Sequence, residues 1–140
     1  LNVGPDPAGR IGKEEIDVLD RVKSWLDRNG DVVYKVIPHP FNYKDREISA
    51  ANGNTAYIHL LADYRGPERM ICGIGNRVRE ITLLSTGEKI GFSQNADKLI
   101  LTGLPFKKEG ELPRVLKLDL DGVPFGIHNP MWPADQFRVC

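Results

Sequence analysis

Apolar residues near the start of the chain recur three or four positions apart, which is the spacing of one face of an α-helix. This stripe consists of Ile16, Leu19, Val22 and Leu26, with Val18 and Trp25 beside it. Gly12 followed by Glu15 is typical of a capped helix start, and Asn29-Gly30 is typical of a helix stop. The pattern predicts an amphipathic α-helix from Lys13 to Arg28.

The residues before this helix predict a loop and the end of a strand. Residues 4–9 read Gly-Pro-Asp-Pro-Ala-Gly and favour a loop, whereas residues 1–3 are typical of a strand end. Together they predict a strand-loop-helix unit whose strand begins upstream of this sequence. After the helix, residues 32–36 predict a short strand, and residues 38–51, interrupted by Pro38, Pro40 and Asn42, predict an irregular connection.

Short segments rich in β-branched and aromatic residues follow at roughly ten-residue spacing. They cover residues 55–62, 69–72, 78–84, 90–93, 98–102 and 115–120, with turn signals such as Asn52-Gly53-Asn54 and Thr86-Gly87 between them. No helical pattern separates them, which favours antiparallel pairing. The predicted fold is therefore mainly β: an antiparallel β-sandwich over residues 52–120, preceded by one helix in residues 1–37 and followed by an irregular tail over residues 121–140.

Composition narrows the classes of function. A chain of 140 residues fits one ordinary domain and cannot hold a large enzyme barrel. Its 19 Lys+Arg residues balance its 19 Asp+Glu residues, so we expect no nucleic-acid partner. Its apolar runs are far shorter than a membrane span requires, so we expect no membrane partner. The two cysteines, Cys72 and Cys140, are far apart in sequence, and a structural disulfide between them is disfavoured.

The short motifs favour structural roles over chemistry. Gly73-Ile74-Gly75 lacks the third glycine and the following helix of a dinucleotide site, which predicts a turn. The stretch Asp119-Leu120-Asp121-Gly122 lacks acids at the calcium-loop positions taken by Lys117 and His128. His39, His59 and His128 have no second ligand at metal-binding spacing. We therefore expect no cofactor and no metal.

Two aromatic residues are candidates for sugar binding. Tyr64 and Trp132 lie in turn-like contexts, where an exposed ring can stack on a pyranose. The alternative, that both rings pack against this domain or a neighbouring one, is favoured and stays open.

The first block of the chain resembles the end of the catalytic domain of family 29 glycoside hydrolases, the α-L-fucosidases. The resemblance rests on Leu1-Asn2-Val3-Gly4-Pro5, Gly9-Arg10-Ile11, Glu14-Glu15, Trp25-Leu26, Asn29-Gly30 and Tyr34. Residues 53–59, 81–87 and 101–105 are similar to the C-terminal β-sandwich of the same enzymes. The resemblance covers residues 1 to about 120.

The resemblance implies a retaining hydrolysis of α-L-fucosides, in which one carboxylate attacks the anomeric carbon and a second carboxylic acid protonates the leaving oxygen. In the family these groups lie upstream of the segment matched by residues 1–5, so no catalytic residue is expected in this chain. The implied partners are a missing N-terminal catalytic barrel and a fucosylated glycan, with Asn2 a candidate for lining the pocket. A periplasmic or extracellular location is implied by analogy. The alternative is an independent carbohydrate-binding or protein-interaction module.

Overall fold

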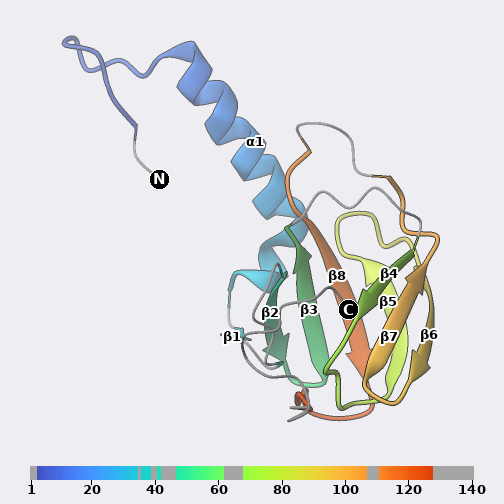
Figure 1. Cartoon of the computed structure of the whole chain (residues 1–140). Coiled ribbons are helices and arrows are strands. Elements are labelled where there is room, and N and C mark those ends of the chain that lie inside the picture. Colours follow the sequence, from blue (N-terminus) through green and yellow to red (C-terminus); the bar gives the residue numbers. More distant parts are fainter. Residues whose placement is uncertain are drawn as a thin grey trace, which may run out of the picture.

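The computed structural model describes residues 3–34, 36–38, 41, 47–61, 68–106 and 111–127. Two antiparallel sheets face each other, and a helix projects from one end of the pair (Figure 1). The elements in chain order are α1 (Lys13–Asn29), a 3₁₀ turn (Gly30–Val32), β1 (Ile37–Pro38), β2 (Glu47–Asn52), β3 (Thr55–Leu60), β4 (Glu68–Ile71), β5 (Val78–Leu83), β6 (Gly91–Asn95), β7 (Lys98–Thr102) and β8 (Arg114–Leu120). The predicted mainly-β class, with one helix before a sandwich, is confirmed.

The sheets have different sizes and are joined by crossovers. Within the described ranges, a five-stranded sheet has the order β1-β2-β3-β8-β5, and a three-stranded sheet has the order β4-β7-β6. Strand β8 lies between β3 and β5, pairing Ile58 with Leu116 on one side and Leu83 with Leu116 on the other. The last described strand in the sequence therefore lies inside the larger sheet, between β3 and β5, and not at its edge.

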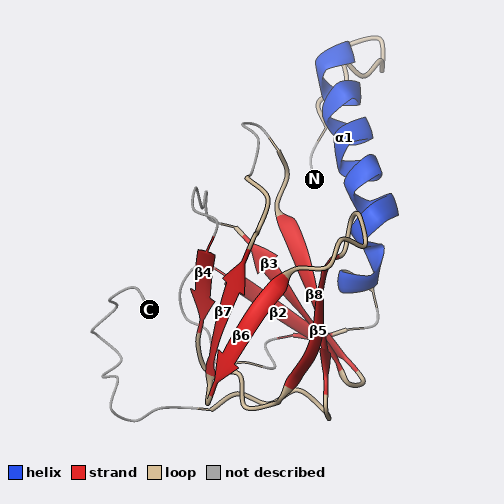
Figure 2. Ribbon diagram, turned by 90° about the vertical axis from the view of Figure 1, so that its right-hand side faces the viewer, coloured by secondary structure: helices blue, strands red, loops and turns tan. Residues whose placement is uncertain are grey.

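Helix α1 begins where the sequence predicts it to begin. The Glu15 carboxylate accepts hydrogen bonds from the backbone N–H of Gly12 at 3.2 Å and of Gly4 at 3.0 Å, which fixes both the helix start and the preceding loop. Within that loop, Asp6 accepts from the N–H of Arg10 at 2.9 Å, and this hydrogen bond lowers the pKa of Asp6. From this loop the helix runs toward the sandwich, which it meets at its C-terminal end (Figure 2).

The helix stop differs from the prediction in form. Gly30 has φ −58° and ψ −28°, so the chain continues into a 3₁₀ turn instead of reversing through a left-handed glycine. The strand predicted over residues 32–36 is therefore wrong: the N–H groups of Val33 and Tyr34 both donate to the Gly30 carbonyl. Val32 is buried instead in a small apolar cluster with Ala50, Tyr57 and Val115 on the outer face of the larger sheet.

The six predicted strand segments are confirmed as β3 to β8, and two strands were missed. Strands β1 and β2 fall in the stretch predicted to be an irregular connection. Pro38 is accommodated because β1 is the outer strand of the sheet, where one side of the backbone needs no partner. In β2, the small residues Ser49, Ala50 and Ala51 are all buried, so the alternation that marks an exposed strand is absent.

The main core lies between the two sheets. All of its residues are at most 5% exposed. From the strands it contains Ala56, Ile58, Leu60, Ile71, Val78, Ile81, Leu83, Leu99, Leu101, Leu116, Leu118 and Leu120. From the connections between strands it contains Phe41, Ile74, Ile90 and Leu104. Burial of this apolar surface is the main stabilising contribution to the sandwich.

The glycine-rich and acidic motifs have structural roles. The stretch from Gly73 to Gly75 lies in the connection between β4 and β5, where Ile74 forms an isolated bridge with Gly126. Asp121 accepts from the N–H of Arg77 at 3.1 Å and from Asn76 Nδ2 at 3.4 Å, so its carboxylate anchors the chain after β8. Beyond it, Phe125 covers Gly75 so closely that a Cβ there would lie 2.2 Å from the ring. Residues 121–127 contain no regular helix or strand, and residues 128–140 lie outside the described residues.

Candidate functional site

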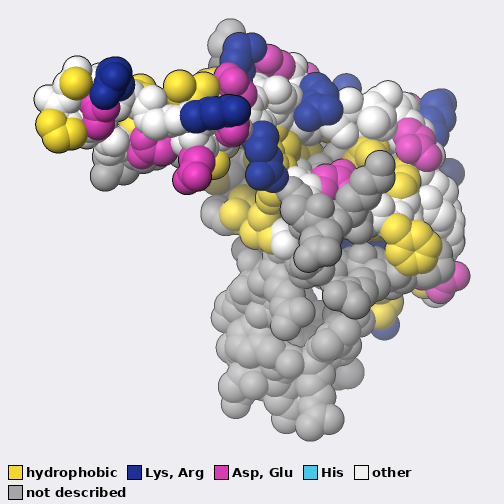
Figure 3. Space-filling model, turned by 90° about the horizontal axis from the view of Figure 1, so that it is seen from above, with side chains coloured by type: hydrophobic (Ala, Val, Ile, Leu, Met, Phe, Trp, Pro, Cys, Tyr) yellow, Lys and Arg dark blue, Asp and Glu magenta, His cyan; other side chains and the backbone are white. Residues whose placement is uncertain are grey.

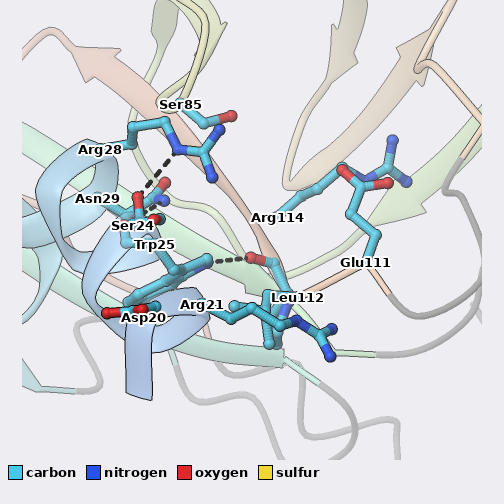
Figure 4. Close-up of a pocket in the computed structure, with 11 residues that line it drawn as sticks. Asp20, Arg21, Ser24, Trp25, Arg28, Asn29, Ser85, Glu111, Leu112 and Arg114 are labelled. Atoms are coloured by element: carbon cyan, nitrogen blue, oxygen red, sulfur yellow. Dashed lines mark hydrogen bonds between the residues drawn. The ribbon is translucent and has the colours of Figure 1, made fainter. Parts of the chain in front are cut away.

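A groove of about 380 Å³ lies where α1 meets the sandwich. Its lining comes from two parts of the chain that are distant in sequence, the second half of α1 and the segment that leads into β8, with one residue from the turn after β5. The lining residues are Asp20, Arg21, Ser24, Trp25, Arg28, Asn29, Ser85, Glu111, Leu112, Pro113 and Arg114. Figure 4 shows Arg28 and Ser85 on one side of the hollow and Arg114 and Glu111 on the other.

Trp25 anchors the helix side of the groove. Its indole Nε1–H donates to the carbonyl oxygen of Pro113 at 2.7 Å, across 88 positions of sequence. Its ring lies 6.3 Å from that of His59, at an angle of 32°. Because burial disfavours the charged imidazolium, the pKa of His59 lies below its usual value of 6.5. Trp25 thus contributes both an aromatic contact and a hydrogen bond to the attachment of the helix end.

Buried polar side chains form part of the lining. Asn29 is 2% exposed and donates through Nδ2 to the Trp25 carbonyl at 2.9 Å, while its Oδ1 has no hydrogen-bond partner. Arg114 is 6% exposed; its Nη1 donates to the Pro105 carbonyl, and its Nε has no hydrogen-bond partner. Burial lowers the pKa of Arg114, and the nearby carboxylate of Glu111 raises it.

The exposed side chains of the groove carry both signs of charge. Asp20, Ser24 and Arg28 follow one another at four-residue spacing, so they lie on one face of α1. Arg28 Nε donates to the Ser24 carbonyl at 3.0 Å, which holds the guanidinium beside the hollow (Figure 4). Viewed from above, basic and acidic side chains are interspersed with apolar ones over the projecting helix (Figure 3).

The site residues proposed from sequence stay predictions. Asn2, Tyr64 and Trp132 all lie outside the described residues, as do His39 and His128. Cys140 also lies outside the described residues, so the absence of a disulfide between Cys140 and Cys72 stays a prediction. The groove itself was missed, because its halves come from segments whose proximity depends on tertiary packing. The four-residue spacing of Asp20, Ser24 and Arg28 was its only local signal.

No group of three or more His, Cys, Asp or Glu side chains among the described residues is placed to hold a metal ion. No described helix has the length and apolar character needed to cross a membrane.

Comparison with solved structures identifies relatives of this fold, although the sequence matches no protein-family model and no curated protein. The α-L-fucosidase isoenzyme 1 of Paenibacillus thiaminolyticus superposes with a TM-score of 0.73 at 27% identity, over 86% of this chain and 30% of that one. The GH29 α-L-fucosidase of Bacteroides thetaiotaomicron gives 0.70 at 25% identity, over 86% and 28%. The α-L-fucosidase of Vibrio sp. strain EJY3 gives 0.78 over 91% and 24%, and at 19% identity it shows the fold alone.

The structural neighbours of this chain are thus GH29 α-L-fucosidases, which confirms the resemblance found in the sequence. The chain spans only 24–30% of the length of these fucosidases, and it matches a C-terminal part of them.

Proposed function

We propose that this chain is the C-terminal portion of a retaining α-L-fucosidase-like glycoside hydrolase. Residues 1–37 would include the last strand, loop and helix of a catalytic barrel, and residues 47–120, which contain β2 to β8, would be an accessory β-sandwich that supports the barrel. By itself the chain would not hydrolyse fucosides.

The observation that carries this proposal is the extent of the structural match. A match over 91% of the chain has to include part of the 17-residue helix as well as the sandwich. Because the match covers only 30% of the Paenibacillus thiaminolyticus fucosidase, the matched elements occur in that enzyme as one part of a larger molecule. The likeness therefore concerns the combination of the two elements, which is more specific than a sandwich alone.

The apolar stripe of α1 supports the same proposal. Ile16 is 44% exposed and Val18 is 52% exposed, and Asn29 is the only buried residue of the helix. An amphipathic helix is stable in proteins mainly because its apolar face is packed against another element. We propose that the catalytic barrel covers this stripe, as neighbouring helices and strands of a barrel do.

The chemistry of the complete enzyme would reside in the proposed barrel. Retaining hydrolysis uses two carboxyl groups about 5 to 5.5 Å apart, one as nucleophile and one as acid and then base. We assign neither role to a residue of this chain. Asn2 is proposed only to line the pocket, from the end of the last barrel strand, where barrel active sites lie.

The test measures hydrolysis of a nitrophenyl α-L-fucoside by the purified 140-residue chain and by the same chain fused to the barrel of the Paenibacillus thiaminolyticus fucosidase. We expect no turnover from the chain alone and turnover from the fusion. A Leu19→Asp variant, which places a charge on the stripe, should destabilise the fusion, whereas Lys23→Gln on the same helix should have a much smaller effect, because it removes only an exposed ion pair with Asp27. Turnover by the chain alone, or equal effects of the two substitutions, would contradict the proposal.

A further inference from the structure

We propose that the loop of residues 4–12 forms part of the rim of the active site, and that Asp6 is a positioning residue that holds this rim in shape. The inference rests on the proposed function, because it requires residues 1–3 to be the last strand of a catalytic barrel. It goes beyond that function by giving one segment of this chain a role in substrate binding.

The loop keeps a defined shape although it buries almost nothing. Among residues 4–12, Asp6 is half-buried and the others are exposed. Hydrogen bonds take the place of packing: the backbone N–H groups of Ala8 and Arg10 donate to Asp6 Oδ1 at 2.8 and 2.9 Å. The N–H of Gly9 donates to the Asp6 carbonyl at 2.8 Å. One residue therefore accepts three backbone hydrogen bonds of the loop.

The remaining contacts of Asp6 close the loop across four positions. Its Oδ2 accepts from Arg10 Nε at 2.9 Å, and its N–H donates to the Arg10 carbonyl at 2.9 Å. Between them, Gly9 has φ +79°, a conformation that favours glycine. An exposed ion pair alone contributes little stability. The shape therefore depends chiefly on the backbone hydrogen bonds to Asp6.

The place of the loop in the proposed barrel puts it at the active site. A segment that runs from the carboxyl end of a barrel strand to the following helix lies on the face where barrel active sites are built. Residues 4–12 are this segment between residues 1–3 and α1. The N–H of Gly4, two positions after the pocket candidate Asn2, donates to Glu15 at 3.0 Å. The loop and the residue proposed to line the pocket are thus joined to the same hydrogen-bonded structure.

The sandwich lies too far from the loop to support it. Figure 1 shows the loop at the end of α1 that is remote from the sandwich. The 17 residues of the helix span about 25 Å at about 1.5 Å per residue. The order of the loop must therefore come from its own hydrogen bonds. A wall of a pocket that is already ordered need not be ordered when substrate binds, which favours binding.

The test uses the fusion to the Paenibacillus thiaminolyticus barrel and measures kcat and KM for a nitrophenyl α-L-fucoside. Asp6→Ala removes the acceptor of two backbone N–H groups and should raise KM about tenfold with a smaller change in kcat, because a pocket wall contacts the substrate before and during reaction. Asp6→Asn keeps an Oδ1 acceptor and should stay within about twofold of the unsubstituted fusion.

The matched control is Asp27→Ala. It removes the carboxylate of another exposed ion pair, with Lys23 at the same four-residue spacing, toward the sandwich end of α1. Both kinetic constants should stay unchanged. Thermal unfolding of each variant separates positioning from stability, because Asp6→Ala should raise KM without lowering the unfolding temperature of the fusion.

Three outcomes would overturn the inference while the proposed function stands. They are equal values of KM for Asp6→Ala and Asp27→Ala, a loss with Asp6→Asn as large as with Asp6→Ala, and a loss with Asp6→Ala that follows a lowered unfolding temperature. A folded but inactive unsubstituted fusion would instead overturn the proposed function, and the inference with it.

Discussion

Helix α1 and the β-sandwich both follow a clear hydrophobic pattern, yet only the sandwich covers its own apolar surface. Inward residues of the sandwich such as Ile58, Leu116 and Leu118 are 0% exposed. On the helix, Ile16 and Val18 remain about half exposed. A periodic pattern therefore shows which face of an element is apolar, and it does not show whether the covering partner lies in the same chain.

The attachments of the two regions differ in the same way. The strands of the sandwich are joined by continuous ladders, such as the six residue pairs between β3 and β8. The helix is joined to the sandwich by the hydrogen bond from Trp25 to Pro113 and by the apolar cluster around Val32 and Tyr57. The sandwich is thus expected to fold as one cooperative unit, with α1 as a less stable extension.

The largest expected difference comes from equal truncations in the two regions. Leu118→Ala, in the middle of β8, should lower the free energy of unfolding by about 2–5 kcal/mol, because it leaves a cavity in a close-packed core. Leu19→Ala, on the stripe of α1, should cost less than about 1 kcal/mol, because little surface is buried there. Urea denaturation of both variants checks this. Equal losses of stability would mean that the helix is part of the cooperative core.

The second prediction concerns packing outside the strands, where Phe125 covers Gly75. Gly75→Ala should destabilise the sandwich by about 1 kcal/mol, because the new Cβ would displace the Phe125 ring, which is 52% exposed and would lose its contact with Gly75 when it moves aside. Gly122→Ala is the matched control, since its Cβ would meet only Asn76 Nδ2, at 3.9 Å. Thermal unfolding of the two variants measures the difference. If Phe125→Leu, which shortens the opposing side chain, fails to restore the stability of Gly75→Ala, the collision is not the cause.

How far the sequence predicted this fold depended on whether the signals were local. The strands β3 to β8 were predictable because alternating apolar residues and turn residues such as Gly87 mark them directly. Strand β2 was not, because its run of small buried residues has no alternation and its partners are β1 and β3. Val32, Val33 and Val36 have β-branched side chains that favour a strand, but Val32 packs instead in an apolar cluster beneath the helix end.

The candidate groove was less predictable than the fold. Its two sides meet because the Pro113 carbonyl accepts the indole N–H of Trp25, and a contact across 88 positions leaves no trace in residue spacing. The family resemblance indicated the kind of protein from which the chain derives. It did not indicate which surface remains open, because that depends on the orientation of α1 on the sandwich.

The third prediction separates the attachment of the helix from the stability of the sandwich. Trp25→Phe keeps an aromatic ring near His59 but removes the donor to Pro113, a loss of about 0.5–1.5 kcal/mol. Amide hydrogen exchange should become faster in the last turns of α1 and stay unchanged in β3 and β8. Faster exchange in those strands as well would show that the two regions open together.

The smallest expected effect is a pH dependence at the same junction. His59 faces Trp25, and its register neighbours Ile48 and Val115 carry no charge. Because burial lowers the pKa of His59 in the folded chain below 6.5, the unfolded chain binds a proton first as the pH falls. Stability should therefore be highest above about pH 6.5 and should decrease as the pH falls below it.

The measurement is the urea midpoint of the chain and of His59→Gln, taken at intervals between about pH 7.5 and pH 5.5. The substitution removes the titrating group at the junction and leaves His39 and His128 in both proteins as an internal control. We expect the urea midpoint of the variant to fall less steeply with decreasing pH. The variant lacks His59, the only described histidine, whose desolvated ring contacts Trp25 of α1. Identical pH profiles would show that protonation of His59 does not oppose folding.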